Sequence, residues 1–434
     1  MAASNSIDNE NADFICDGTD DHVEIQRAID NLPSGGGSVY LREGTYSIGA
    51  TINLNNNVAL IGAGAGTLLY LENNVNDDVI YGILLDNLLI ANLRIDGNGS
   101  NNISSEGIYI SVSWKLRIEG TWIQNCYYDG IYLETCYYSI VINNILDGNL
   151  TGDGIFSDSG QYNNFVGNIL TGNGLDGITV QGGSWNTVTG NTADGNTYDG
   201  ISLWGFADFN TITGNTSEGN GEHGIGIGST CTNNTISGNT IEGNGQAGIN
   251  LINYCDHNTI SNNTIVGNSQ TTNNVDNGIQ IKNSSYTNIQ GNTVRRGTGS
   301  KKQNTGITIL SGTSNFVANN DLYQAGAAEN FSDAGTGTIF DYSQSGLAEN
   351  VVPIDSSGFK QNITITFPVS FPSVPRVIAN LANFDNDAAV AYIVQIETIT
   401  TDNFTIRAYV DTAATGDADV IWYATVASQS GGRE

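Results

Sequence analysis

Basic residues are scarce in this chain. Only 14 of its 434 residues are Lys or Arg, against 44 Asp and Glu, which gives a formal net charge of −30 at pH 7. Residues 118–281 contain no Lys or Arg at all. Nucleic-acid binding is therefore not expected, because phosphate contacts depend on basic side chains. The acid excess favours neutral sugars, or acidic sugars bridged by a metal ion, as ligands, and it is equally typical of proteins from a saline habitat.

Long apolar runs are also missing, and proline is scarce, with 5 residues. No run of about 18 apolar residues exists, so neither a transmembrane helix nor membrane insertion is expected. The 54 glycines, with many Asn and Thr, disfavour long helices. The first residues, MAASNSIDNENADF, lack the basic head and apolar core of a secretory signal peptide. These features indicate a large, acidic β-protein that is rich in turns.

Familiar chemical signatures are absent as well. An odd number of irregularly spaced cysteines (Cys16, Cys126, Cys136, Cys231 and Cys255) does not form a disulfide framework. The three histidines are scattered, and no His/Cys cluster suggests a metal site. Nucleotide-binding loops, the Gly-x-Ser-x-Gly elbow and His-Glu-x-x-His do not occur. No metal site or cofactor is predicted, although calcium stays a candidate ion.

The main positive feature of the sequence is a strong internal repeat. A Gly-Ile element followed by alternating apolar residues recurs nine times at spacings of 23–30 residues, beginning at Gly107, Gly130, Gly154, Gly177, Gly200, Gly224, Gly248, Gly278 and Gly306. A second element places an asparagine at one equivalent position, at Asn144, Asn168, Asn191, Asn215, Asn239, Asn263, Asn292 and Asn320. One such unit of short strands and polar turns cannot bury its apolar side alone, so the units are expected to stack.

The stacking pattern predicts an all-β fold, a right-handed parallel β-helix whose coils pair as parallel strands roughly 4.8 Å apart. The repeated Asn fits a left-handed turn position from which it bonds its neighbours in adjacent coils. A column of small side chains includes Cys136, Cys231 and Cys255, which are interpreted as buried fillers. Because Cys231 and Cys255 would be stacked neighbours, a disulfide between them is an alternative.

Residues 21–32 predict an amphipathic helix. Ile25, Ala28, Ile29 and Leu32 share one face, and Asp21 with Glu24 resembles a capping box. A strand over residues 39–41 follows a run of three glycines. The helix is expected to cover the open end of the β-helix and to protect its edge.

Residues 16–48, CDGTDDHVEIQRAIDNLPSGGGSVYLREGTYSI, resemble the opening of pectate-lyase-superfamily β-helix proteins, a group that includes phage tailspikes and polysaccharide-active enzymes. With the repeats, the resemblance covers about residues 12–345, and residues 1–345 are predicted to form the β-helix domain. The resemblance implies a fold and not a reaction. The Asp-Asp and Gly-His-Gly elements of polygalacturonases, the Asp-Pro-His element of alginate epimerases and the arginine of pectate lyases are all missing.

The pattern changes near residue 346, after which four of the five prolines fall. Short alternating strands predict a small antiparallel β-sandwich over residues 346–434. Phe371, Pro375, Val377, Phe404 and Trp422 resemble the scaffold of an H-type lectin domain. That resemblance implies a six-stranded sandwich, a homotrimer and sugar binding. Arg407 and Tyr423 are candidates for sugar contacts, and the alternative is a domain with Trp422 in its core that only trimerises.

The outward residues of the Gly-Ile strands form the candidate site. The apolar residues of these strands point inward, so alternate residues share one outer surface. Aromatic and polar side chains on this surface, and the acidic residues before the repeat glycines, are the candidate glycan contacts: Tyr109, Tyr132, Phe156, Gln181, Trp204, Asp153, Asp176 and Asp199. Two alternatives remain, since Asp before Gly is ordinary turn chemistry and exposed aromatics also form subunit interfaces.

Glu134 and Asp158 are the catalytic candidates. They fall on adjacent coils, roughly 5 Å apart by strand spacing. Carboxylates that close repel each other, so one is expected to bind its proton more tightly. Such a separation suits a retaining glycosidase. A basic loop contains Arg295, Arg296, Lys301 and Lys302. It is expected to bind an acidic sugar or to pair with the acids of a partner subunit, and the alternative is a solvated loop.

Three functions remain open. A homotrimeric, tailspike-like protein of the virion surface or extracellular space, which binds cell-surface polysaccharide with or without cleaving it, accounts for both predicted domains and for the missing signal peptide. A secreted polysaccharide hydrolase, lyase or epimerase accounts for the carboxylates. A structural trimeric appendage without activity accounts for the fold alone.

Overall fold

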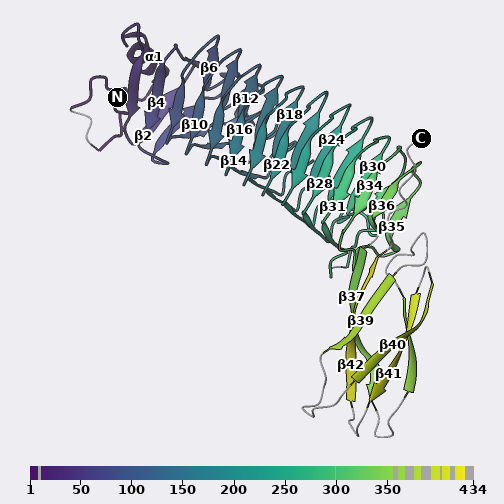
Figure 1. Ribbon diagram of the computed structural model, residues 1–434. Coiled ribbons are helices and arrows are strands. Elements are labelled where there is room, and N and C mark those ends of the chain that lie inside the picture. Colours follow the sequence, from purple (N-terminus) through teal and green to yellow (C-terminus); the bar gives the residue numbers. More distant parts are fainter. Residues whose placement is uncertain are drawn as a thin grey trace.

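The computed structural model describes residues 1–7, 11–298, 300–341, 343–354, 360–366, 376–382, 392–400, 403–410 and 416–425. After residue 339 its side chains are described only at 398–400 and 403–405. Figure 1 shows a long solenoid of parallel strands, with antiparallel strands beyond its last coil. The predicted right-handed parallel β-helix is confirmed.

Three parallel sheets run the length of the solenoid, and each coil contributes at most one strand to each sheet. The 13-stranded sheet contains β1 (Gly37–Leu41), β4 (Val58–Gly62), β7 (Leu89–Ala91), β10 (Arg117–Glu119), β13 (Ile140–Ile142), β16 (Asn164–Val166), β19 (Thr187–Thr189), β22 (Thr211–Thr213), β25 (Thr235–Ser237), β28 (Thr259–Ser261), β31 (Asn288–Gln290), β34 (Phe316–Ala318) and β36 (Ile339–Asp341). The 11-stranded sheet contains β2 (Gly44–Ile48), β5 (Thr67–Leu71), β8 (Arg94–Asp96), β11 (Trp122–Gln124), β14 (Ile145–Asp147), β17 (Ile169–Thr171), β20 (Thr192–Asp194), β23 (Thr216–Glu218), β26 (Thr240–Glu242), β29 (Thr264–Val266) and β32 (Thr293–Arg295).

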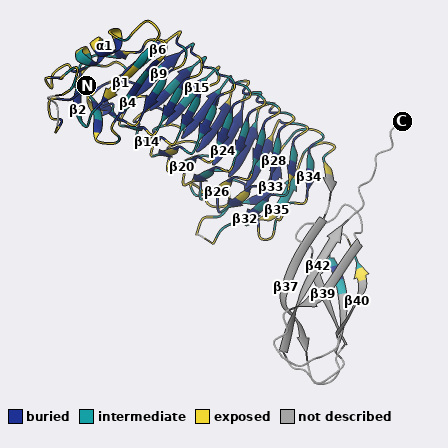
Figure 2. Ribbon diagram, turned by 60° about the vertical axis from the view of Figure 1, so that its left-hand side comes forward, coloured by how far each residue is buried: buried dark blue, intermediate teal, exposed yellow. Residues whose placement is uncertain are grey.

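The third sheet carries the Gly-Ile repeats. Its 12 strands are β3 (Ile52–Asn53), β6 (Ile80–Ile83), β9 (Ile108–Ser111), β12 (Ile131–Glu134), β15 (Ile155–Asp158), β18 (Ile178–Gln181), β21 (Ile201–Trp204), β24 (Ile225–Gly228), β27 (Ile249–Ile252), β30 (Ile279–Lys282), β33 (Thr305–Ile309) and β35 (Glu329–Asp333). Ile131 pairs with Ile108 on one side and Ile155 on the other, so the repeat residues stack in register. These isoleucines are buried along the solenoid axis, and Figure 2 shows the continuous dark-blue core.

Asparagine side chains link successive coils. Asn168 donates from Nδ2 to Asn191 Oδ1 (2.9 Å) and to the Val141 carbonyl oxygen (2.9 Å), and its own Oδ1 accepts from the Asn144 backbone N–H (3.0 Å). The predicted bonding between coils is confirmed. The predicted left-handed position is wrong by one residue, because the positive φ belongs to the preceding residue, such as Asn143 (55°) or Gly167 (62°). That residue makes the turn and leaves the buried Asn free to bond.

A nine-residue helix, α1 (His22–Asp30), lies at the N-terminal end of the solenoid. Ile25, Ala28 and Ile29 are buried, as expected for a cap on the open end. A short 3-10 helix, η1 (Gly99–Asn101), lies within a later coil. No helix of the described residues is long and apolar enough to cross a membrane.

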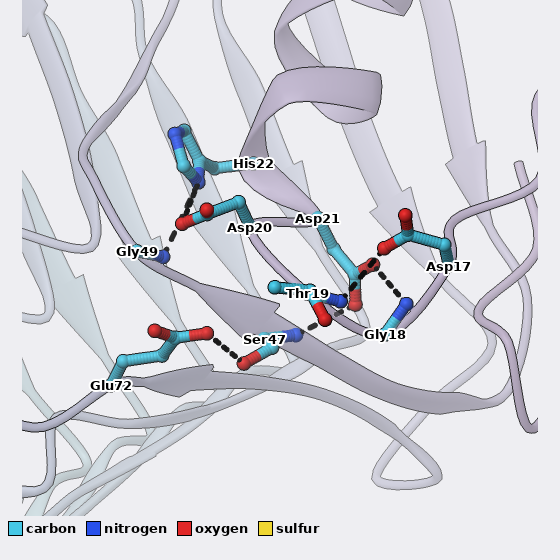
Figure 3. A network of polar contacts seen from close by, with 9 residues as sticks. All are labelled: Asp17, Gly18, Thr19, Asp20, Asp21, His22, Ser47, Gly49 and Glu72. Atoms are coloured by element: carbon cyan, nitrogen blue, oxygen red, sulfur yellow. Dashed lines mark hydrogen bonds and ion pairs between the residues drawn. The ribbon is translucent and has the colours of Figure 1, made fainter.

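The capping box expected at Asp21 and Glu24 is wrong. Asp21 makes no side-chain hydrogen bond to the start of α1. Its Oδ1 instead accepts from the Gly18 N–H and its Oδ2 from the Ser47 N–H, both at 2.8 Å (Figure 3). The buried carboxylate thus joins the loop before α1 to strand β2, which explains the aspartate more simply than helix capping.

All five cysteines are free and buried. Cys231 and Cys255 lie in neighbouring coils, and Sγ of each donates to a carbonyl oxygen three residues earlier, at 3.0 Å. The interpretation of the cysteines as buried fillers is confirmed, and no disulfide joins Cys231 to Cys255.

The described C-terminal strands are antiparallel. Sheet β37 (Ser343–Ile354), β42 (Gly416–Thr425), β39 (Arg376–Ala382) lies beside sheet β38 (Lys360–Thr366), β41 (Asn403–Val410), β40 (Tyr392–Ile399), with three strands in each. Phe404 is fully buried. The predicted small antiparallel unit is confirmed, and the first antiparallel strand begins two residues after the last parallel one.

Candidate functional site

A groove with a volume of about 680 Å³ runs along the outside of the solenoid. It spans the coils from Glu106 to Glu222, most of which lie in the segment without Lys or Arg. Its lining is aromatic and acidic: Glu106, Tyr128, Asp129, Tyr132, Thr151, Gly152, Asp153, Phe156, Leu175, Asp176, Thr179, Gln181, Tyr198, Asp199, Ser202, Trp204 and Glu222. The groove therefore contains seven of the eight glycan contacts predicted on the surface of the solenoid, all except Tyr109.

Three columns of side chains build this groove, each repeating once per coil. The residue before the acid supplies an exposed side chain in three coils, at Tyr128, Leu175 and Tyr198. The acids themselves are more deeply buried, with Asp153 only 5% exposed. The outward residues of β12, β15, β18 and β21 complete the lining. Aromatic rings thus flank a buried row of carboxyl groups.

Four aspartates form a continuous hydrogen-bonded row, which we call the aspartate ladder (Asp129, Asp153, Asp176 and Asp199). The Oδ1 of each accepts the backbone N–H of the next residue in the column, at 2.6 Å for Asp129, 2.8 Å for Asp153 and 2.7 Å for Asp176. The last bond runs from the His223 N–H to Asp199 Oδ1, at 2.8 Å. Each carboxyl group therefore has one oxygen committed to the fold.

Burial raises the pKa of these carboxyl groups. The pKa of Asp129 is raised to about 7 by burial. The pKa values of Asp153 and Asp199 are raised by burial and by the neighbouring aspartates, and that of Asp176 mainly by burial. Glu106 continues the column, and burial, with the charges of Asp78 and Asp129, raises its pKa to about 8. Its Oε2 is buried without a hydrogen-bond partner.

The two catalytic candidates lie beside the groove rather than in its lining. Register pairs Glu134 of β12 with Asp158 of β15, as the repeat predicts. Glu134 Oε2 accepts from the Ser111 hydroxyl (2.6 Å) and from the Tyr109 hydroxyl (2.8 Å). These bonds lower the pKa of Glu134, so this carboxylate is held in its ionised form. Asp158 accepts from the Ser159 hydroxyl at 2.9 Å.

The aromatic candidates divide between the groove and its surroundings. Tyr132 and Phe156 line the groove, with ring centroids 5.0 Å apart. Tyr109 stacks on Tyr132 at 4.7 Å, and its hydroxyl is bound to Glu134, so it buttresses the lining from the neighbouring coil. Trp204 is 43% exposed and lies against Gly228, where a Cβ atom would overlap its ring.

A second aromatic row lies outside this groove. Tyr138, Tyr162, Trp185 and Phe209 stack with centroids 5.0, 5.3 and 5.5 Å apart and rings within 8° of parallel. All four have positive φ values, between 55° and 59°, which is unusual for bulky residues. Because their faces cover one another, mainly the ring edges are available to a ligand. This row therefore does not offer a stacking platform for sugars.

Candidate metal ligands meet at one end of the groove. One ligand atom from each of Asp199, Glu222 and His223 lies within 4.8 Å of the others. Both ring nitrogens of His223 are already engaged, Nδ1 by the Ala247 N–H (3.1 Å) and Nε2 by the Asn250 side chain (2.9 Å). A second such group, formed by Cys16, Asp21 and Glu24, lies at the N-terminal cap. Each set contains only two carboxyl residues, whereas calcium takes six to eight oxygen ligands, so neither set identifies a calcium site.

The groove also contains residues that were not predicted to contact a glycan. Tyr128, Leu175, Tyr198 and Glu222 precede the column of acids and its continuation at His223. Their recurrence at one repeat position was visible in the sequence, and that periodicity could have identified them. Their orientation was not visible, because a residue in a turn has no alternation that fixes its side.

The remaining candidates lie elsewhere. Arg295 forms an ion pair with Asp321 at 2.5 Å, and both Arg295 and Arg296 line a separate cavity of about 490 Å³. Arg407 lies in β41 and Tyr423 in β42, but their side chains fall outside the described part of the chain. The two arginines of the basic loop therefore line a cavity other than the groove. The two C-terminal candidates remain predictions.

Comparison with known families agrees with this architecture. The chain matches the right-handed β-helix region family. The matches span residues 69–217 and 106–265. Residues 362–425 match the H-type lectin domain, and residues 229–341 match a family described as periplasmic copper-binding protein (NosD). A search of curated sequences finds no match.

Solved structures share the fold at low sequence identity. The A-module of mannuronan C-5 epimerase AlgE6 from Azotobacter vinelandii is 22% identical, with a TM-score of 0.61, covering 74% of this chain and 96% of that one. The Dettilon tailspike protein (gp208) is 14% identical, with a TM-score of 0.57, covering 93% and 90%. An N-terminal fragment of bacteriophage Phi29 gene product 12 is 16% identical, with a TM-score of 0.58, covering 72% and 63%. These similarities establish the fold and leave the function to the site.

Proposed function

We propose that this protein binds a polysaccharide chain in the groove between Glu106 and Glu222. The observation that carries the proposal is the coincidence of exposed rings and hydrogen-bonding side chains along one groove of about 680 Å³. Ligand sites in proteins combine apolar and aromatic walls with a few polar groups that fix orientation. Repetition of both kinds of side chain in successive coils suits a ligand that is itself a repeating chain.

The combination of the two domains supports a tailspike-like role at a virion or cell surface. A β-helix followed by an H-type lectin domain is one assembly that would suit a trimeric fibre, and the tailspike fold similarity is consistent with it. The homotrimer and the extracellular location remain parts of this proposal. Sugar contacts at Arg407 and Tyr423, in the C-terminal unit, would be additional to those in the groove.

Cleavage of the bound chain is a second candidate function. Glu134, held ionised by two hydroxyl donors, has the state that a nucleophile needs, and Asp158 is its partner on the next coil. A retaining glycosidase also needs a proton donor with a raised pKa, and in this pair that role would fall to Asp158. In the wild-type protein, loss of polymer size that is abolished by Glu134→Gln would support this role.

The test of binding uses a panel of neutral and acidic polysaccharides, with and without calcium. Binding is followed by affinity electrophoresis, while polymer size and new reducing or unsaturated ends report cleavage. We expect at least one polysaccharide to bind, and Trp204→Ala to weaken it at least tenfold. Trp185→Ala is the matched control, because Trp185 is 46% exposed in the row outside the groove. Equal effects of the two substitutions, or no binding across the panel, would contradict the proposal.

A further inference from the structure

Acidic side chains occupy their column along the whole groove and also one coil before it, at Asp78, whose Oδ1 accepts the Glu106 N–H at 2.9 Å. The groove is lined at this position by Glu106 and by the aspartate ladder. On the C-terminal side of the groove the same position before the repeat glycine carries His223, Ala247 and Asn277. The column is therefore acidic in every coil of the groove, while later coils of the same repeat do without an acid.

The fold itself does not require these negative charges. Each ladder aspartate supplies one oxygen that accepts a backbone N–H from the next coil. Buried asparagines elsewhere accept backbone N–H groups in the same way, as when Asn196 Oδ1 binds the Asn173 N–H at 3.1 Å. A neutral amide can thus do the structural work of the carboxyl group. Burial also disfavours the ionised carboxylate, so ionisation of these acids costs free energy that a neutral amide at the same position would not cost.

No positive charge is available to balance an acidic ligand here. None of the residues lining the groove is Lys or Arg. His223 follows Asp199 in the same column, and its imidazole ring is neutral because burial lowers its pKa to about 4. A sugar carboxylate in this groove would lie unpaired beside other carboxyl groups, which is a costly arrangement.

We infer that the aspartate ladder selects the glycan: the groove admits chains of neutral sugars and excludes chains that carry a carboxylate on every residue. This inference rests on the proposed glycan-binding function. Neutral sugar hydroxyls can donate to an ionised carboxylate or accept from a protonated one. A uronate instead brings its charge beside the ladder, where every ionised carboxyl group repels it, as Asp129 does above its pKa of about 7, and specificity commonly depends on such repulsive elements.

The test compares polysaccharides that differ only in oxidation at C6. Three pairs serve as probes: mannan and mannuronan, galactan and galacturonan, glucan and glucuronan. Dissociation constants are measured at pH 8 with EDTA, which removes bridging divalent ions. We expect the wild-type chain to bind at least one neutral member at least tenfold more tightly than its uronate partner.

The double variant Asp129→Asn/Asp176→Asn should lower the ratio of the uronate dissociation constant to the neutral one at least fivefold, because the amides keep the hydrogen-bonding oxygens and carry no charge. Asp194→Asn, which removes an exposed charge outside the groove, should leave this ratio unchanged. Thermal unfolding verifies that the variants fold, and single Asp129→Asn serves if the double variant does not. Equal binding of both members of a pair by the wild type, or undiminished discrimination by the variants, would overturn this inference alone. Absence of binding to all six probes would overturn the proposed function and the inference with it.

Discussion

At the scale of single residues, two glycines of β24 shape one end of the groove. A Cβ atom at Gly226 would overlap the carboxylate of Asp199, and one at Gly228 would overlap the ring of Trp204. Both glycines face outward in a strand where other coils carry larger side chains, such as Phe156 or Gln181. The absence of side chains at these two positions is therefore what lets an aromatic ring and a carboxyl group lie close to the next coil.

We expect Gly228→Ala to displace Trp204 and to weaken glycan binding. The added methyl group has no space, and overpacking of this kind costs about 1–3 kcal/mol. Near-ultraviolet circular dichroism should report the altered environment of the indole, and affinity electrophoresis the lost binding. Gly35→Ala is the control, since no atom lies within 4 Å of the position that its Cβ would take and its φ is ordinary. An unchanged indole spectrum in Gly228→Ala would contradict the assigned packing.

The titration of buried acids predicts a stability that falls as the pH rises. The pKa values of Asp78, Glu106 and Asp129 are about 6, 8 and 7 in the folded protein, above those of unfolded carboxyl groups. The folded state therefore binds protons more tightly, and this contribution is lost as the pH rises from about 4 to about 8. His223 acts in the opposite direction, because its lowered pKa costs stability below about pH 6.5.

We accordingly expect the Tm at pH 5.5 to exceed that at pH 8.5 by several degrees, as measured by differential scanning calorimetry at constant ionic strength. Asp129→Asn should flatten this dependence, because the amide does not titrate. A Tm that rises between pH 5.5 and pH 8.5 would show that the buried acids do not dominate the pH dependence.

At the scale of elements, asparagine ladders tie the sheets together along the solenoid. Asn191 Nδ2 donates to the Phe165 carbonyl oxygen (2.9 Å) and to Asn215 Oδ1 (3.0 Å). Its own Oδ1 accepts from the Asn168 N–H (2.8 Å). Because every polar atom of this buried side chain is bonded, the ladder stabilises the turn instead of costing free energy.

Replacement of Asn191 by Ala should lower the free energy of unfolding by about 2–4 kcal/mol, since several buried groups lose their partners at about 1–3 kcal/mol each. Chemical denaturation monitored by far-ultraviolet circular dichroism measures the loss. Asn55→Ala provides a comparison, because Asn55 is exposed and makes one long hydrogen bond of 3.4 Å. Similar losses in both variants would contradict the special role of the ladder.

At the scale of the whole molecule, the solenoid provides the groove, and the C-terminal strands provide the features on which the proposed assembly rests. Each coil contacts only its neighbours in the sheets, as repeat proteins do, so a groove can extend over several coils without any long-range crossing of the chain. A trimer would present three such grooves to one surface and would raise apparent affinity through multivalency.

If the proposed homotrimer forms, the full chain should have a molar mass of three times 45.9 kDa by light scattering coupled to size-exclusion chromatography. Trp204→Ala should leave this mass unchanged, because Trp204 lies in the groove and not in the C-terminal unit. A mass of 45.9 kDa at micromolar concentration would contradict the trimer and leave the groove proposal intact.

The coils and their register could be predicted from the amino-acid sequence without any coordinates. The Gly-Ile repeat and its phased asparagines can be satisfied only when equivalent residues stack, so the pairing of Ile131 with Ile155 and of Glu134 with Asp158 followed from spacing. The same reasoning placed the buried cysteines and the helix at the open end. Periodicity is a property of the sequence, and parallel stacking converts it directly into contacts.

The pairing of polar groups in the turns, in contrast, emerged only from the folded chain. Asp21 bonds Gly18 and Ser47 rather than its own helix, and the turn residue before each ladder Asn takes the left-handed conformation. The raised pKa values belong to the aspartate ladder, while hydroxyl donors lower that of Glu134. These outcomes depend on burial and on the direction of side chains in turns, where no simple period relates a residue to its side, and so they were set by three-dimensional packing.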